Sequence, residues 1–338
     1  MSQFMCRPAP RNARLRLALI TVTAATTILA VASISAHAQV AATAGAWSQA
    51  MPMPHAITEV GAAALDGKIH VLGGSVDGRM VHSFHGEYDT LTNLWRWRAP
   101  LPRELSHVGV TAMGDRIYAV GGLSDPDTVH TGAIDLVFEY DPKTDRWRTL
   151  APMKAARAAV GAVAIDGKLH AIGGRALDQS TLNLHQAWDP ATNTWSDRAP
   201  LPKARDHMAT IAVDGKIHVI GGRFAGSAEN TGMHDVYDPK TDTWSPAPPM
   251  PTPRSGVSFG FAKGKIIVAG GECRNRATYN EVEAFDVTAG KWTQLTPLPS
   301  GRHAFGGASV GEKIFFAGGS RGCGGNDKAN DLLVLTPP

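Results

Sequence analysis

Four arginines recur at one spacing in this sequence, each of them ten residues after a tryptophan. They are Arg157, Arg205, Arg254 and Arg302, while Ile57 and Leu105 take the same position after two other tryptophans. Guanidinium groups recognise carboxylates and phosphates through paired hydrogen bonds. One hypothesis is therefore a basic ring that binds an anion, joined by Arg175 and Arg223. The other is that the arginines tie structural units together through carbonyl groups or acids.

A second set of residues could transfer protons. Glu59, His107 and His207 each stand twelve residues after a tryptophan, and His303 stands eleven residues after one. Carboxyl and imidazole groups placed together can act as general acids and bases. Glu59, His107 and His207 are therefore candidate catalytic residues, and His303 is a candidate ligand-binding residue. Ordinary surface hydrogen bonding is the alternative for all of them.

The sequence offers no sign of a cofactor or a metal. It contains no nucleophile elbow, phosphate-binding loop, dinucleotide fingerprint or zinc-ligand spacing. Three other histidines share one position of a repeat in which sister copies hold isoleucine or phenylalanine, so we expect them in the core. They are His70, His170 and His218, with Ile267 and Phe315 among their counterparts.

These residues belong to a repeat that runs through the chain six times. Gly-Gly pairs fall at 73/74, 121/122, 173/174, 221/222, 270/271 and 318/319, and tryptophans at 47, 95, 147, 195, 244 and 292 keep the same steps of 48 to 52 residues. Two markers in one register indicate one supersecondary unit per period.

Each period predicts four antiparallel strands. A strand of small residues leads through a two-residue turn such as Asp166-Gly167 into an apolar strand that ends at Gly-Gly. The third strand ends in an aromatic-Asp pair such as Tyr140-Asp141, and a hairpin then leads to the strand that carries tryptophan. Four antiparallel strands per repeat describe the blade of an all-β propeller.

The two ends of the chain complement each other. Trp47 begins a fourth strand that has no predecessors, whereas 331–335 forms a third strand that no tryptophan follows. Pairing these two segments completes the sixth blade and removes the exposed edges. We therefore expect a six-bladed propeller over residues 47–338, closed by its N-terminal strand.

The Gly-Gly and tryptophan pattern resembles the Kelch repeats of β-propellers and covers nearly everything after residue 46. The resemblance implies a binding face around the central channel, where Kelch domains take partner peptides, and here a small anion, an acidic glycan or an acidic peptide. Periplasmic N-acetylneuraminate epimerases are similar in architecture, which makes sugar anomer exchange the enzymatic alternative, whereas a purely structural envelope protein is a third. The copper-radical site of galactose oxidase is not expected, because Tyr279 is the one tyrosine without a place in the repeat.

The first 38 residues have the features of a secretory signal. Four arginines precede an apolar run that ends at Ala36-His37-Ala38, so we expect cleavage after Ala38, a short linker over 39–46 and a periplasmic or extracellular protein. An uncleaved membrane anchor is the alternative. Without the signal the formal charge falls from +3 to −1, which does not favour nucleic-acid binding. We expect a monomer without a membrane span.

Two cysteines remain after the signal. Cys273 and Cys323 follow the Gly-Gly pairs of adjacent repeats by two and four residues. An exported protein can form disulfides, and equivalent loops of neighbouring blades could meet. A bridge and two free thiols are both open at this point.

Overall fold

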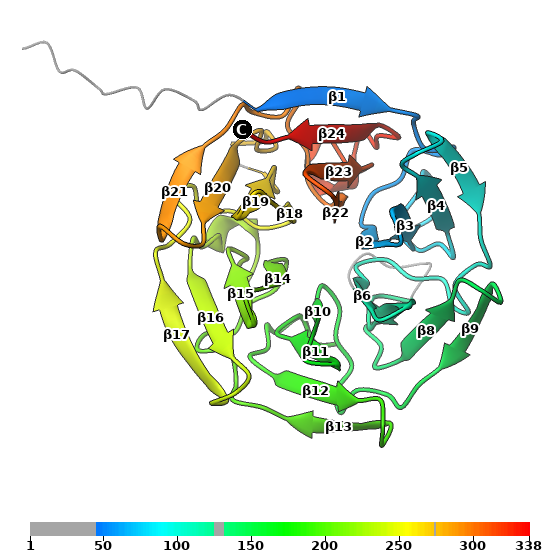
Figure 1. The fold of residues 1–338 in the computed structure, drawn as a ribbon, viewed down its shortest axis with the longest axis vertical. Helices are drawn as coiled ribbons and strands as arrows, with labels where there is room; N and C mark the ends of the chain where they lie inside the picture. The colour runs from blue at the N-terminus through cyan, green and yellow to red at the C-terminus, as the bar shows by residue number, and fades with distance from the viewer. Residues whose placement is uncertain (1–44, 125–131, 274) are drawn as a thin grey trace, which may run out of the picture. The chain divides into compact units, whose positions relative to one another are not determined.

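The computed structural model describes residues 45–124, 132–273 and 275–338. In this part of the chain, twenty-four strands form six four-stranded antiparallel sheets arranged as a ring around a central axis (Figure 1). The predicted six-bladed propeller is confirmed. The proposed signal segment, residues 1–38, lies outside the described residues, as does most of the linker. No helix among the described residues is long and apolar enough to cross a membrane.

The blades follow one another along the chain, with the innermost strand first. Blade 1 holds β2 (Gly61–Leu65), β3 (Lys68–Leu72), β4 (His85–Asp89) and β5 (Leu94–Trp97), and blade 2 holds β6 (Gly109–Met113), β7 (Arg116–Val120), β8 (Val137–Asp141) and β9 (Arg146–Thr149). Blade 3 holds β10 (Gly161–Ile165), β11 (Lys168–Ile172), β12 (His185–Asp189) and β13 (Thr194–Asp197).

The second half of the ring repeats this order. Blade 4 holds β14 (Ala209–Val213), β15 (Lys216–Ile220), β16 (His234–Asp238) and β17 (Thr243–Ala247), with the short 3-10 helix η1 (Ser227–Glu229) between β15 and β16. Blade 5 holds β18 (Ser258–Ala262), β19 (Lys265–Ala269), β20 (Val282–Asp286) and β21 (Lys291–Gln294). Blade 6 holds β22 (Gly306–Val310), β23 (Lys313–Ala317), η2 (Cys323–Gly325), β24 (Leu332–Thr336) and the N-terminal β1 (Ala46–Ala50).

The N-terminal strand closes the ring as expected. β1 pairs antiparallel with β24, and Trp47 lies opposite Leu335 (Figure 1). β1 therefore takes the outer position that β5 occupies in blade 1, and the first and last strands of the ring share one sheet.

Turn residues explain why each repeat folds into hairpins. Asp166 and Gly167 both have positive φ, at 50° and 70°, as a two-residue hairpin turn between twisted strands requires. Asp145, two residues before Trp147, has a φ of 53°, which reverses the chain between the third and fourth strands. Asn, Asp and Gly tolerate this left-handed backbone best, so these positions are predictable from the sequence.

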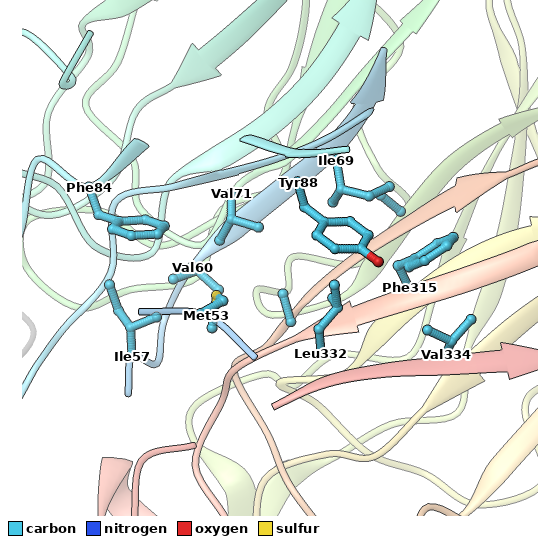
Figure 2. Close-up of a cluster of buried hydrophobic side chains, with 12 residues drawn as sticks. Met53, Ile57, Val60, Ile69, Val71, Phe84, Tyr88, Phe315, Leu332 and Val334 are labelled. Carbon is cyan, nitrogen blue, oxygen red and sulfur yellow. The ribbon is translucent and has the colours of Figure 1, made fainter. Parts of the chain in front are cut away.

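The core lies between the faces of adjacent blades. In the cluster of Figure 2, Ile69 and Tyr88 of blade 1 pack against Phe315, Leu332 and Val334 of blade 6. Apolar strands covered on both faces, as the sequence predicts for the second strand, supply this interface. The contact between the first and last blades is thus a packed hydrophobic interface, and the strand pair β1–β24 completes blade 6.

The repeated tryptophans connect blades by a hydrogen bond. In every blade the indole Nε1 donates to a backbone carbonyl of the preceding blade, for example from Trp147 to Ala99 at 2.8 Å and from Trp47 to Thr296 at 3.1 Å. The other four pairs are Trp95 with Met51, Trp195 with Ala151, Trp244 with Ala199 and Trp292 with Pro248. These indoles are structural groups at the outside of the ring.

The Gly-Gly pairs form a circle of backbone hydrogen bonds between blades. The second glycine of each pair donates its N–H to the carbonyl ten residues after the tryptophan of its own blade, where the chain enters the next blade, at 2.7 to 3.1 Å. The six donor–acceptor pairs, which we call the glycine ring, are Gly74 with Leu105, Gly122 with Arg157, Gly174 with Arg205, Gly222 with Arg254, Gly271 with Arg302 and Gly319 with Ile57. Because the last bond returns to blade 1, the circle has no end.

The core histidines occur as buried pairs. His218 Nδ1 lies 2.9 Å from His234 Nε2, and His70 with His85 and His170 with His185 repeat this contact in two other blades. The outer histidine of the pair also places Nδ1 near a backbone carbonyl, as His185 does with Ala199 at 3.1 Å. Burial lowers the pKa of His218 to about 4 and that of His234 to about 3, with His218 as a second cause for His234.

We predict that substituting Gly121 by alanine destabilises the ring far more than substituting Gly114. Both glycines have a φ near +60°, but a Cβ on Gly114 meets nothing within 4 Å, whereas one on Gly121 overlaps the Arg157 carbonyl oxygen of the next blade. Gly114→Ala should carry only the left-handed strain, about 1–2 kcal/mol. Urea unfolding of both variants checks this. Equal free energies of unfolding would contradict a role for close blade contact.

We also predict that the histidine pairs make the protein acid-sensitive. A pKa below the ordinary 6.5 means that the unfolded chain takes up the proton first, so stability is complete above pH 6.5 and is lost as the pH falls toward about 4. His218→Ile with His234→Val introduces the residues that blade 5 holds at these positions, Ile267 and Val282. This double variant should lose less stability between pH 7 and pH 4 than the unaltered protein. Parallel curves of unfolding free energy against pH would refute the prediction.

Candidate functional site

A second circle of backbone hydrogen bonds surrounds one mouth of the channel. It joins the residues twelve positions after each tryptophan, and each N–H donates to the carbonyl of the preceding blade at 2.8 to 3.4 Å. The six residues, which we call the mouth ring, are Glu59, His107, Ala159, His207, Gly256 and Ala304. All six have a φ between 49° and 62°. Because the backbone holds this ring, its side chains can differ from blade to blade.

The mouth ring brings the three proton-transfer candidates together. Ligand-type atoms of Glu59, His107 and His207 all lie within 4.8 Å of one another. Glu59 Oε2 is 3.2 Å from His107 Nε2, and the rings of His107 and His207 meet edge to face with centroids 5.4 Å apart. The other three members of the mouth ring are alanine or glycine, which leaves room for this cluster.

The residue before each histidine orients its imidazole. Asp206 Oδ1 lies 2.5 Å from His207 Nδ1, and Ser106 Oγ lies 3.0 Å from His107 Nδ1. Asp206 and Ser106 are themselves buried, with 2% of each residue exposed. In both histidines the side chain of the preceding residue therefore contacts Nδ1. Nε2 of His107 lies 3.2 Å from Glu59 Oε2, and Nε2 of His207 lies 3.4 Å from Arg223 Nη2.

Burial controls the protonation of the cluster. It raises the pKa of Glu59 to about 8, with Glu272 as the second cause, while Arg223 and Arg175 act in the opposite direction. Glu59 is therefore largely protonated at neutral pH. Burial and then Arg223 lower the pKa of His207, so this imidazole is neutral. Burial works against the ionised form of Asp206, but His207 and Arg223 outweigh it and hold its pKa at about 2.

Arg223 reaches the mouth but is held by acids. Its Nε donates to Asp206 Oδ1 at 3.0 Å, Nη1 donates to Glu272 Oε2, and Nη2 lies 3.4 Å from His207 Nε2. Arg175 takes the same position in blade 3 and is also buried, and its charge acts on Asp206 and Glu59. The basic side chains at the mouth are thus balanced by Asp206 and Glu272, two acids that the sequence analysis did not single out.

The four repeated arginines do not face the mouth, which corrects the expectation that they bind an anion there. Arg157, Arg205, Arg254 and Arg302 have at most 1% of their surface exposed. Arg254 illustrates the arrangement: Nε donates to the Gly270 carbonyl at 2.7 Å, Nη2 to the Val268 carbonyl at 3.0 Å, and Nη1 to Glu283. Arg157 binds the Gly173 and Leu184 carbonyls and Gln186, Arg205 binds Asp235, and Arg302 binds Asp331.

Comparison of the repeats contains a signal for this internal role. Blades 3, 4 and 5 pair the arginine with a polar residue at the second position of the third strand: Gln186, Asp235 or Glu283. Blades 1 and 2 lack the arginine and hold Gly86 and Phe138 there. In blade 6 this position is Leu333, and Arg302 binds Asp331, the residue before the strand, instead. In the first five blades, arginine and a polar residue at this position therefore occur together or not at all.

A cavity of about 220 Å³ opens beside the cluster. Its walls combine polar side chains with two apolar ones and come from blades 1, 2, 5 and 6. They comprise Thr58, Glu59, Ser75, Met80, Ser106, His107, Leu123, Glu272, His303, Lys328 and residues 324–326. Small residues of the innermost strands, such as Gly61, Ala162 and Gly307, line part of the channel below. The candidate His303 thus lies in the cavity wall, where Nε2 is 3.2 Å from the Gly322 carbonyl.

The two cysteines lie at the same side of the mouth. Cys273, after the Gly-Gly pair of blade 5, and Cys323, in blade 6, form a disulfide with Cα atoms 5.6 Å apart. Gly324 and Gly325, which follow directly, line the cavity. The bridge therefore connects two neighbouring blades beside the cavity.

Comparison with known proteins agrees with this architecture. The family model of the Kelch-repeats domain of KLHDC2, KLHL20 and DRC7 matches residues 107–319, more than half of the chain, and the chain belongs to the Kelch-repeat β-propellers. The solved "Structure of YjhT" is similar over 84% of this chain and 96% of that one, with a TM-score of 0.72 and 17% sequence identity. At 17% sequence identity this similarity shows that the two proteins share the fold, and nothing more.

We predict that Arg254 contributes stability only together with Glu283. Arg254→Leu leaves the Glu283 carboxylate buried without its partner, which should reduce the unfolding free energy by about 3–5 kcal/mol. The double variant Arg254→Leu/Glu283→Phe reproduces the pair that blade 2 holds, Leu105 and Phe138, and should recover most of this loss. Thermal and urea unfolding measure both. If the double variant is no more stable than Arg254→Leu, the pair is not the stabilising unit.

Proposed function

We propose that this Kelch-repeat protein is an exported binding protein that takes one small, hydroxyl-rich ligand, such as a single sugar unit, into the mouth cavity. The observation that carries the proposal is the cavity of about 220 Å³, lined by hydroxyl, carboxyl and imidazole groups beside Met80 and Leu123. Export is inferred from the first 38 residues of the sequence and from a disulfide between neighbouring blades, which an oxidising compartment favours.

The size of the cavity favours a small ligand over a peptide. Pockets for drug-sized molecules measure about 300–1,000 Å³, and this cavity is smaller. Extended peptides need a groove along several blades, whereas the lining residues here gather around the mouth ring. A partner peptide could insert only its last residue or one side chain.

The charges of the wall favour hydroxyl groups over a purely anionic ligand. Glu59 and Glu272 both line the cavity, and the guanidinium group of Arg223 is already bound by Asp206 and Glu272. An acidic group on the ligand would face His303 and Lys328, and Lys328 Nζ already donates to Asp77 at 2.9 Å. Acidic sugars are therefore included among the ligands we propose, but the arginines of the repeat do not select them.

Sugar anomer exchange is the second candidate function. The convergence of Glu59, His107 and His207 favours it, because ring opening needs an acid at the ring oxygen and a base at the anomeric hydroxyl. With a pKa of about 8, Glu59 carries a proton at neutral pH and is suited to the acid role. The imidazole of His107, whose Nε2 lies 3.2 Å from Glu59 Oε2, is placed for the base role.

A ligand screen tests both candidates. We expect thermal stabilisation by at least one member of a panel of neutral hexoses, uronic acids, N-acetylneuraminate and sugar phosphates, since a ligand at 100 times its Kd adds about 2.7 kcal/mol to stability. Met80→Trp should fill the cavity and weaken binding at least about tenfold. Met51→Trp, the same change at an exposed position on the outside of the ring, should leave binding unaltered.

In the same samples, NMR exchange spectra show whether the protein accelerates anomer interconversion. Acceleration that is lost in Glu59→Gln establishes the second candidate, and binding without acceleration establishes the first. The proposal is wrong if no panel member stabilises the protein, or if Met80→Trp and Met51→Trp bind equally.

A further inference from the structure

The cluster in the mouth ring has the composition of a metal-ligand set. Glu59, His107 and His207 provide one carboxylate and two imidazoles, and their ligand atoms lie within 4.8 Å of one another. Each comes from a different blade, with 48 residues from Glu59 to His107 and 100 from His107 to His207, so no metal-binding motif is visible in the sequence. Two imidazoles with one carboxylate suit divalent transition metals such as zinc, iron and cobalt.

The orientation of the histidines agrees with metal ligation. Histidines that bind metals usually direct their other ring nitrogen to a carboxylate or another hydrogen-bonding group, which fixes the tautomer. Asp206 takes this role behind His207 at 2.5 Å, and Ser106 lies behind His107 at 3.0 Å. Nε2 is then the nitrogen that each ring offers to an ion, and in His107 it lies 3.2 Å from Glu59 Oε2.

We propose that Glu59, His107 and His207 bind one divalent transition-metal ion at the mouth of the channel, through a carboxylate oxygen and the two Nε2 atoms. The site goes beyond the proposed ligand binding and does not depend on it. Its remaining coordination positions would face the cavity that Glu59 and His107 line, where water or a ligand hydroxyl group could occupy them.

The geometry requires only a small adjustment. Metal–ligand bonds of about 2.1 Å in a tetrahedral arrangement place ligand atoms about 3.4 Å apart. Glu59 Oε2 and His107 Nε2 already lie 3.2 Å apart, so the approach of His207 by about an ångström completes the set. The backbone ring holds all three Cα atoms, and the side-chain torsions supply this movement.

Two arginines oppose the binding of a cation at this site, whereas two acids favour it. Arg223 Nη2 lies 3.4 Å from His207 Nε2, on the side that the ion would occupy, and Arg175 adds a second positive charge. The acids Asp206 and Glu272 bind Arg223 independently of His207, so metal binding removes only its weakest contact. Glu59 must release its proton to bind the ion, and metal affinity should therefore rise with pH.

Metal titration of the untagged protein tests the proposal. We expect isothermal titration with Zn²⁺ to give one site per chain, Co²⁺ to produce visible absorption bands typical of low coordination number, and both to raise the melting temperature. The variants His107→Ala, His207→Ala and Glu59→Ala should each abolish these three signals. Asp206→Asn should weaken Zn²⁺ binding about 10- to 100-fold, as loss of an orienting partner does.

The alanine variants are expected to fold, because blades 3 and 6 hold Ala159 and Ala304 at the same left-handed position of the mouth ring. His303→Ala is the matched control: it removes another mouth histidine outside the proposed ligand set, at a position where blade 3 holds Ala158, and should bind metal normally. The proposal is overturned if the unaltered protein binds neither ion at one-to-one stoichiometry, or if His303→Ala loses binding while His107→Ala and His207→Ala keep it. Neither result would bear on the ligand screen of the proposed function, so the two proposals can fail separately.

Discussion

Two closed circles of backbone hydrogen bonds set the geometry of this protein. In the glycine ring, the second glycine of each pair donates to the next blade, and in the mouth ring each left-handed residue donates to the preceding blade. Neither circle has an end, since Gly319 returns to Ile57 and Glu59 donates to Ala304. The angle between successive blades is therefore fixed by main-chain contacts near the axis, and the packed side chains further out only have to fill the space that results.

Because backbone hydrogen bonds hold the mouth ring together, its side chains can differ from blade to blade without breaking the ring. Alanine or glycine at three positions of the mouth ring makes room for one carboxyl and two imidazoles at the others. The same division explains the arginines ten residues after tryptophan. The backbone carbonyl of each of these arginines accepts a hydrogen bond of the glycine ring from the preceding blade. The guanidinium group of the same residue turns the other way, into the blade that the chain is entering, as Arg254 does toward Gly270.

The chemistry of the mouth comes from burial and compensated charge. Asp206 and Glu272 neutralise Arg223, and Asp206 also orients His207. Arg223 and Arg175 lower the pKa of Glu59, but burial and the charge of Glu272 outweigh them and raise it to about 8. A buried carboxyl that is protonated at neutral pH can give its proton to a ligand, which is the property that anomer exchange would use. The metal proposal rests instead on the geometry of Glu59, His107 and His207.

The sequence by itself determined the architecture. The period of glycines and tryptophans, the turn residues such as Asp166-Gly167 and the complementary ends at Trp47 and Leu335 predict six blades and their closure, because backbone dihedral preferences and strand periodicity are local properties. Sister repeats also identified His70 and its counterparts as core residues. Only the tertiary structure decided that Arg254 is buried within its blade and that Cys273 forms a disulfide with Cys323. It also decided that Glu59, His107 and His207 lie in one cluster. These outcomes depend on the curvature of the ring and on the left-handed backbone at its mouth, which bring together residues that are far apart in the chain.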